Sequence, residues 1–303
     1  MSDNLLPIVA VALLLVPMFL LIGLVLLWNW LQRRRKRRSP LTSELLRPPG
    51  YGCAEKLDAL RWDVGGYLMA AIWAPSTLLA LFLLQHGVGE PMNRPPLIAT
   101  GLVYGGSGLL LFAVLAVLIV RLLGRIRAYR DGRDGELATA QLLEPVIAGG
   151  GRVLHDIQGD GFNVDHAVVA PGGIFAIETK HRMKPTTGRG ADNAKVRFDG
   201  RALRFPDWTD TRTAEQAAAQ ARWLGERLSR ATGLPVQARP IIALPGWYVD
   251  NTAKTEVFAI NPKNCQFMLK PYAGRSPLDA ETIQRIAHQL EQLCRLPDSR
   301  PST

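Results

Sequence analysis

The stretch Asn163–Lys180 contains the residues best suited to chemistry. It reads NVDHAVVAPGGIFAIETK, so Asp165 stands near the start of one apolar run, and Glu178 and Lys180 stand near the end of the next. Two apolar runs around a Pro-Gly-Gly turn predict a β-hairpin whose strands are covered on both faces. A loop centred on Pro171 and Gly172 would place Asp165 opposite Glu178, with their Cβ atoms roughly 5 Å apart.

Two opposed carboxylates in an apolar sheet repel each other and lose hydration. A divalent cation between them would offset both costs, because hard cations prefer oxygen ligands. Lys180 shares the face of Glu178, since side chains alternate along a strand. There it would orient an attacking water or neutralise a phosphate, which predicts metal-assisted hydrolysis. Three alternatives stay open: a buried salt bridge with Lys180, a site that binds without cutting, and a one-residue slip that opposes His166 to Glu178.

The surrounding sequence predicts the elements that must position these residues. Asp134 can cap a helix running to about Ile147, with Glu136 in its first turn, where the helix dipole also favours an acid. A strand at 153–157 precedes the hairpin, and a second hairpin turns at Asp199-Gly200. Helices are expected at 213–231 and 278–296, and strands at 236–244 and 256–260. This order predicts a mixed α/β sheet with helices on both faces.

The stretch from about Asp134 to Leu244 resembles the nuclease-related domain (NERD) family of the PD-(D/E)xK nucleases. The matching pieces are Gly135-Glu136, Val164-Asp165-His166 with the apolar run that follows, and the run from Gly173 to Lys180 that ends in Glu178-Thr179-Lys180. Gln216 follows in the next helix. The Asn-Pro that often precedes the family's glutamine is replaced by Arg212-Thr213, so Gln220 is the alternative to Gln216.

This resemblance implies a restriction-endonuclease-like fold and a role for each matching residue. Asp165 and Glu178, with the backbone carbonyl of Thr179, would bind Mg²⁺ or Mn²⁺. Lys180 would position or activate water. Glu136 would complete the acidic cluster, and Gln216 would orient the substrate or Lys180.

The stretch Lys180–Arg204 is basic, with eight Lys or Arg against two Asp. It directly follows the candidate site, where a phosphate backbone would lie, so DNA or RNA is the expected partner. The aromatic residues Phe205 and Trp208 would stack on splayed bases. The alternative is a solvated basic loop lying against anionic lipid. The candidate nucleic-acid contacts are Arg182, Lys184, Arg189, Lys195 and Arg197.

Three stretches have no Lys, Arg, Asp or Glu: Asn4–Gln32, Val64–Gly89 and Pro95–Val120. Each is long enough for a membrane-spanning helix, which needs about 20 apolar residues. We therefore expect transmembrane helices at about 5–31, 64–85 and 97–121. The first stretch is followed by RRRKRR and not by a small-residue cleavage site, which favours an uncleaved anchor over a signal peptide.

The basic residues predict the topology of this multi-pass protein. Nine Lys or Arg lie between Gln32 and Asp63, one lies in His86–Arg94, and five follow from Arg121 to Arg133. The positive-inside rule then places the N-terminus outside the inner membrane and the C-terminal domain in the cytoplasm. We expect a membrane region at 1–130, with a basic linker at 32–63, and a nuclease-related domain at 131–303.

The net charge of +10 is no argument for nucleic-acid binding. Residues 1–130 carry 14 Lys/Arg against 6 Asp/Glu, whereas residues 131–303 carry 22 against 20. Most of the charge therefore fixes topology beside the lipid bilayer. The sequence predicts a membrane-anchored, metal-dependent nuclease. The alternative is a non-catalytic module that tethers nucleic acid or a protein partner. Cys53, Cys265 and Cys294 are expected to be reduced, structural thiols, and His155 and Asp156 to lie solvated at a strand end.

Overall fold

A computed structural model describes residues 5–33, 45–87, 96–186, 191–271 and 276–296. The chain divides into two compact units. The helical unit comprises residues 1–42 and 58–126, and the sheet unit comprises residues 43–57 and 127–303. Part of the predicted basic run (residues 34–38) and of the connection at 86–94 lies outside the described residues.

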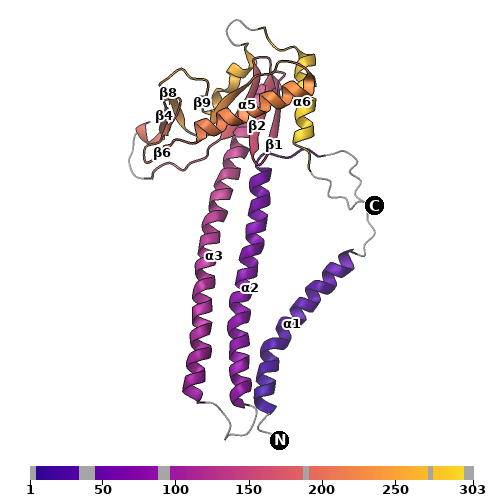
Figure 1. Ribbon diagram of the computed structural model, residues 1–303, viewed down its shortest axis with the longest axis vertical. Coiled ribbons are helices and arrows are strands. Elements are labelled where there is room, and N and C mark those ends of the chain that lie inside the picture. Colours follow the sequence, from indigo (N-terminus) through magenta and orange to yellow (C-terminus); the bar gives the residue numbers. More distant parts are fainter. Residues whose placement is uncertain (1–4, 34–44, 88–95, 187–190, 272–275, 297–303) are drawn as a thin grey trace. The chain divides into compact units, whose positions relative to one another are not determined.

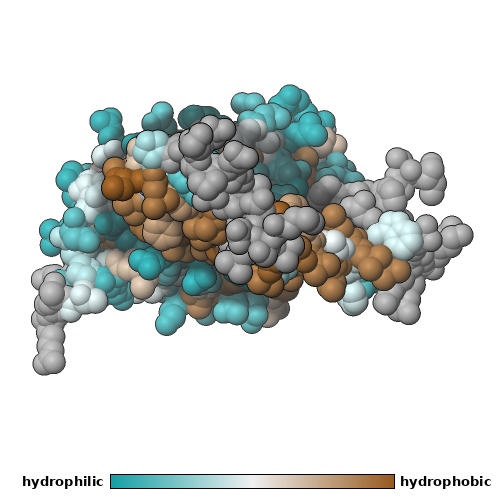
Figure 2. Space-filling view, turned by 90° about the horizontal axis from the view of Figure 1, so that it is seen from below, coloured by the Kyte–Doolittle hydropathy of each residue, from teal (hydrophilic) through white to brown (hydrophobic). Residues whose placement is uncertain are grey.

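The helical unit contains α1 (Leu5–Arg33) and most of α2 (Tyr51–Gly87) and α3 (Leu97–Leu142). All three helices are long and apolar enough to cross a membrane. Many of their large apolar side chains are exposed, and Figure 2 shows a broad band of hydrophobic residues on the face that it views. Between the helices, Phe82 packs edge-on against Tyr104. The unit therefore has apolar surfaces of the kind that a lipid bilayer covers.

Two of these helices are longer than the sequence predicted. The expected span at 64–85 is part of α2, which already begins at Tyr51, and the span at 97–121 is part of α3, which continues to Leu142. The prediction that a helix begins at Asp134 is therefore wrong. Helix α3 passes through Asp134 without a break, and only a short α4 (Glu144–Ala148) follows. Glu136 lies inside a long helix, so the proposed dipole role at a helix start does not apply.

The sheet unit contains the predicted mixed sheet (Figure 1). Its strands are β1 (Arg152–Gln158), β2 (Asn163–Ala170), β3 (Gly173–Thr179), β7 (Ala238–Ala243) and β9 (Phe258–Ile260), in the order β1-β2-β3-β7-β9. Strands β1, β2 and β3 pair antiparallel, whereas β7 is parallel to β3 and β9. The predicted hairpin register is confirmed, because Ala170 faces Gly173 and His166 faces Ile177. The slipped alternative is thereby excluded.

A second, smaller sheet was not foreseen as a separate layer. It is formed by β4 (Lys195–Phe198), β5 (Leu203–Arg204), β6 (Thr209–Asp210) and β8 (Tyr248–Asn251) in the order β6-β5-β4-β8. The predicted turn at Asp199-Gly200 is present, with Phe198 facing Leu203. Gly200 has φ of +92°, a conformation that side-chain-bearing residues rarely adopt.

Helices cover the larger sheet on both faces, as predicted. On one face, α5 (Thr213–Thr232) and α6 (Ala280–Leu293) bury Leu224, Leu228, Ile286 and Leu290 against the strands. On the other, α4 and the 3₁₀ segment η3 (Pro262–Leu269) bury Val146 and Met268. Each fully buried large apolar side chain contributes about 1.5–3 kcal/mol. These two layers fix the ends of β2 and β3, where the candidate site lies.

A segment that the sequence analysis placed in the linker belongs to the sheet unit. We name residues 45–57 the strap. Its backbone pairs with the chain after α6, because the N–H of Arg47 donates to the carbonyl of Cys294 at 2.7 Å and the N–H of Leu296 donates to the carbonyl of Leu45 at 2.8 Å. The strap ends in the first residues of α2.

Candidate functional site

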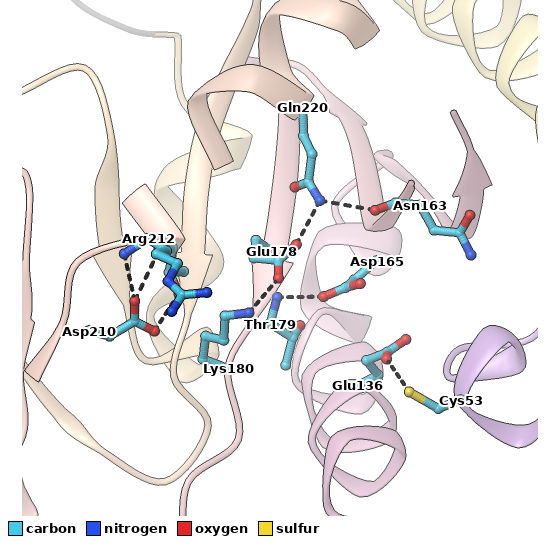
Figure 3. A network of polar contacts seen from close by, with 11 residues as sticks. Cys53, Glu136, Asn163, Asp165, Glu178, Thr179, Lys180, Asp210, Arg212 and Gln220 are labelled. Carbon is cyan, nitrogen blue, oxygen red and sulfur yellow. Dashed lines mark hydrogen bonds and ion pairs between the residues drawn. The ribbon is translucent and has the colours of Figure 1, made fainter. Parts of the chain in front are cut away.

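The end of the β2–β3 hairpin brings Asp165 and Glu178 together (Figure 3). Asp165 precedes His166 and Glu178 follows Ile177, so the two acids lie one position beyond the last paired residues of the hairpin, in the same register. The Oδ2 atom of Asp165 accepts a hydrogen bond from the backbone N–H of Thr179 at 2.7 Å. The hairpin therefore fixes the first acid through the backbone of the residue next to the second.

Glu178 is held by two donors. Its side chain is buried, with the residue 4% exposed. Lys180 Nζ lies 2.9 Å from Oε1, and Gln220 Nε2 donates to Oε2 at 2.7 Å. The same Gln220 nitrogen also donates to the carbonyl of Asn163 at 2.9 Å. Glu178, Lys180 and Gln220 thus form one polar group at the carboxyl end of β3.

Of the two glutamines that the sequence left open, the structure brings Gln220 and not Gln216 to Glu178. Gln216 is exposed on α5, whereas Gln220, one helical turn later, is 2% exposed and contacts Glu178. The reason is the helical period, because the buried face of α5 carries Ala217, Ala221 and Leu224. Placing Gln220 on this face was possible from the sequence, since it precedes Ala221 and lies one turn before Leu224.

Glu136 approaches the acids from α3 and is held by the strap. Its Oε2 accepts from the backbone N–H of Gly50 at 3.1 Å, and its Oε1 accepts from Cys53 Sγ at 3.3 Å. Glu136 is 9% exposed and belongs to the sheet unit. It lies outside the expected membrane span, whose charge-free stretch ends at Val120. Burial raises its pKa to about 7, and the charges of Asp156 and Glu178 act in the same direction.

The site holds more negative charge than its neighbours balance. Burial raises the pKa of Asp165 well above its usual value, and the charges of Glu178 and Glu136 raise it further. Burial alone would lower the pKa of Lys180, but the charge and hydrogen bond of Glu178 outweigh it and raise this pKa. Lys180 is therefore an ammonium group near neutral pH, so it can neutralise or orient but cannot accept a proton in this state.

Two buried polar atoms beside this group have no hydrogen-bond partner among the described residues. They are Gln220 Oε1 and Thr179 Oγ1. Buried acceptors normally find a donor or a cation. In the part of the chain that the structure describes, no three His, Cys, Asp or Glu side chains are grouped closely enough to hold a metal ion by themselves. A cation here would therefore need the two carboxylates, backbone oxygen and solvent or substrate.

The basic residues predicted to contact nucleic acid are dispersed. Lys180 leads into an extended stretch in which Arg182 lies over the ring of Trp208, 4.3 Å from its centroid, and exposed Lys184 lies 5.5 Å from that of Trp247. Lys195 pairs with Asp250 at 2.8 Å. Arg197 is exposed on β4, and Arg189 lies outside the described residues.

The aromatic prediction is only partly compatible with the structure. Trp208 is 45% exposed and available to stack, whereas Phe205 is buried edge-on against Trp247. The guanidinium of Arg182 already occupies one side of Trp208 and also pairs with Asp207 at 3.7 Å. Trp208 with Arg182 is therefore the part of this surface best suited to an unpaired base.

The expectation that His155 and Asp156 are solvated is wrong. Asp156 is buried, has φ of +50°, and accepts from Arg47 at 2.8 Å and from the Asn163 side chain at 2.9 Å. His155 instead contacts buried His166, with 2.8 Å between their Nδ1 atoms. Arg47 and Cys53 were missed because they lie far from the motif in sequence. One arginine and one cysteine in a basic segment gave no sign that the segment packs against the sheet.

The raised pKa of Glu136 predicts a pH-dependent stability. The pKa of Glu136 is about 7 in the folded protein, against an ordinary value of 4.5, so the folded state binds this proton more tightly than the unfolded state does. The free energy of unfolding therefore falls as pH rises from about 4.5 to about 7, by up to about 3 kcal/mol for this group. We expect Glu136→Gln to remove much of this fall in full-length protein denatured in detergent without divalent cations. Glu144→Gln, at an exposed site on α4, is the control. Equal pH slopes in the wild type and Glu136→Gln would contradict the assignment.

Comparison with known proteins identifies one similarity. Residues 131–245 match the family model described as a nuclease-related domain (NERD). No curated protein matches the chain, and no solved structure does. The matched range contains Glu136, Asp165, Glu178, Lys180 and Gln220 but none of the strap. The match indicates a nuclease-related function for this part of the chain.

Proposed function

We propose that this chain is a membrane-anchored nuclease whose sheet unit hydrolyses phosphodiester bonds of nucleic acid with the help of a divalent metal ion. The observation that carries the proposal is the convergence of Asp165, Glu178 and Lys180 at one end of the β2–β3 hairpin, inside the range that matches the nuclease-related family. The mixed sheet with flanking helices is compatible with a restriction-endonuclease-like fold, which we propose for this unit.

The donor set fits Mg²⁺ or Mn²⁺. Asp165 and Glu178 offer carboxylate oxygens from adjacent strands, and the backbone carbonyl of Thr179 directly follows Glu178 in the sequence. Burial raises the pKa of Asp165 and the charge of Glu178 raises it further, so a cation would relieve both the lost hydration and the repulsion. Hard cations take such oxygen ligands. A bound ion of this kind supplies charge neutralisation at a phosphate and lowers the pKa of a coordinated water.

The protein's own residues supply positioning. Lys180, as an ammonium group beside Glu178, is placed to neutralise a phosphate oxygen or to orient the attacking water. Gln220 holds the other oxygen of Glu178 and ties it to the backbone of β2, which fixes the carboxylate. Glu136 adds negative charge from α3, and its carboxylate is engaged by the strap.

The surface beside the site is suited to a nucleic-acid strand. Lys184 and Arg197 are exposed, and Trp208 with Arg182 offers a stacking face. Three apolar helices would anchor the protein in the inner membrane. The distribution of basic residues supports a cytoplasmic sheet unit, which is part of this proposal. DNA or RNA is the proposed partner in addition to the lipid bilayer.

A non-catalytic module that tethers nucleic acid or a protein is the alternative, because Glu178 is already paired with Lys180. Melting temperatures of full-length protein in detergent, titrated with Mg²⁺, separate the two proposals. The nuclease account expects Mg²⁺ to stabilise the wild type and not Glu178→Ala, because the variant loses one of two carboxylate ligands. Equal responses of the two proteins, or none, would favour the tether. Glu215→Ala, exposed on α5, serves as the matched control.

A further inference from the structure

The strap approaches the candidate site at two separate points. At the first, Arg47 forms a buried ion pair with Asp156, with 2.8 Å between Nη1 and Oδ2 and side-chain exposures of 6% and 4%. Asp156 in turn accepts from the side chain of Asn163, at the start of β2. The carbonyl of Asn163 accepts from Gln220, which holds Glu178. A continuous polar chain therefore runs from the strap to the second acid.

At the second point the strap holds Glu136 directly. Both carboxylate oxygens of Glu136 are engaged by strap residues, Oε2 by Gly50 and Oε1 by Cys53 (Figure 3 shows the thiol contact). Burial, followed by the charge of Glu136, raises the pKa of Cys53 to about 12. The cysteine therefore keeps its proton near neutral pH and remains a hydrogen-bond donor.

Two strap glycines lie where the strap packs closely against the sheet unit. A Cβ atom on Gly52 would lie 3.1 Å from both the Asn163 amide nitrogen and the Asp156 carboxylate. Gly50 has φ of +74°, and a Cβ there would lie 2.9 Å from the Arg133 side chain. The backbone of the strap is therefore fitted against β1, β2 and α3 at the positions that lead to the acids.

We propose that the strap is a positioning element of the site, in which Cys53 and Gly50 set the carboxylate of Glu136 and Arg47 anchors the strap to the β1–β2 end of the sheet. This inference rests on the proposed function, because it assigns the strap to the same metal-dependent site. It adds residues outside the range that matches the nuclease-related family. A fragment limited to residues 131–303 would lack all of these contacts.

The test compares Cys53→Ala with Cys53→Ser in full-length protein in detergent. Two quantities are measured: the Mg²⁺ concentration that gives half of the thermal stabilisation, and the rate of strand cleavage. We expect Cys53→Ala to raise the half-stabilising Mg²⁺ concentration about three- to tenfold, because Glu136 loses one hydrogen bond to a charged group. Cys53→Ser retains a donor and is expected to stay within about twofold of the wild type.

Cys265→Ala is the matched control, because Cys265 Sγ also donates to an oxygen at 3.3 Å, the carbonyl of Leu142, away from the acids. It is expected to lower the melting temperature without changing the Mg²⁺ dependence. A wild-type Mg²⁺ response that Cys53→Ala leaves unchanged, or that Cys53→Ser fails to restore, would overturn the positioning role alone. Absence of any Mg²⁺ response in the wild type would overturn the proposed function and this inference with it.

Discussion

Replacing Lys180 by alanine is expected to lower the rate of strand cleavage by about 10²–10³-fold, the range typical for the loss of one preorganised group that stabilises charge at the reacting centre. Lys180 Nζ lies 2.9 Å from Glu178 and is the basic side chain in direct contact with an acid of the site. Its removal leaves the Glu178 oxygen free, so Mg²⁺-linked stabilisation is expected to persist or to strengthen. Loss of catalysis with retained metal binding would identify Lys180 as a residue of the chemical step.

Lys184→Ala is the control for this prediction. Lys184 is exposed and stands four residues later in the same basic stretch. Its replacement by alanine therefore removes an equal charge and leaves the contacts of Glu178 intact. We expect a weaker, salt-dependent effect on substrate affinity, because an exposed lysine contributes through phosphate attraction. If Lys180→Ala and Lys184→Ala reduced cleavage equally, the basic stretch would act only through its charge, and the specific role of Lys180 would be rejected.

The second large effect concerns stability. Arg47→Ala is expected to cost the sheet unit about 3–5 kcal/mol, because it leaves Asp156 buried without its charged partner. Arg152→Ala breaks a more exposed pair with Glu291, whose side chains are 46% and 23% exposed, and is expected to cost less than about 1 kcal/mol. Denaturation of full-length protein, followed by tryptophan fluorescence, measures both.

An equal loss for the two arginine variants would show that the Arg47–Asp156 pair is not buried as described, and that the strap does not belong to the folded unit. A selective loss in Arg47→Ala would predict that a fragment starting near residue 130, which lacks the strap, is less stable than the full-length protein. Such a loss would also show that Arg47, just before α2, contributes to the stability of the sheet unit that carries the site.

The hairpin could be predicted from the sequence because its information is local. The Pro171-Gly172 loop fixes the register, and the register alone places Asp165 beside Glu178. The helices expected at 213–231 and 278–296 and the strands expected at 236–244 and 256–260 are also present as α5, α6, β7 and β9, and Asp199-Gly200 marked the second turn, whereas β6 and β8 were not predicted. The predicted features depend on residues close together in the chain.

The features that were missed have different causes, and only the strap depends on a contact between distant segments. The helix boundary before Glu136 was wrong because Asp134 is a good cap in isolation, yet helix-forming residues before it let α3 continue. The strap resembled a linker because Arg47 and Asp156 are 109 residues apart in sequence. The choice between Gln216 and Gln220 stayed open because Arg212-Thr213 replaces the Asn-Pro of the family pattern, and the buried face of α5 places Gln220 at Glu178.

The most direct test of the central claim is cleavage of labelled DNA and RNA, single- and double-stranded, by full-length protein in detergent. The account predicts product with Mg²⁺ and none with EDTA. It also predicts that Asp165→Ala abolishes cleavage while remaining folded, because Asp165 supplies one of two carboxylates at the site. Cleavage that persists in EDTA, or that survives Asp165→Ala, would contradict a metal-dependent nuclease at the end of the β2–β3 hairpin.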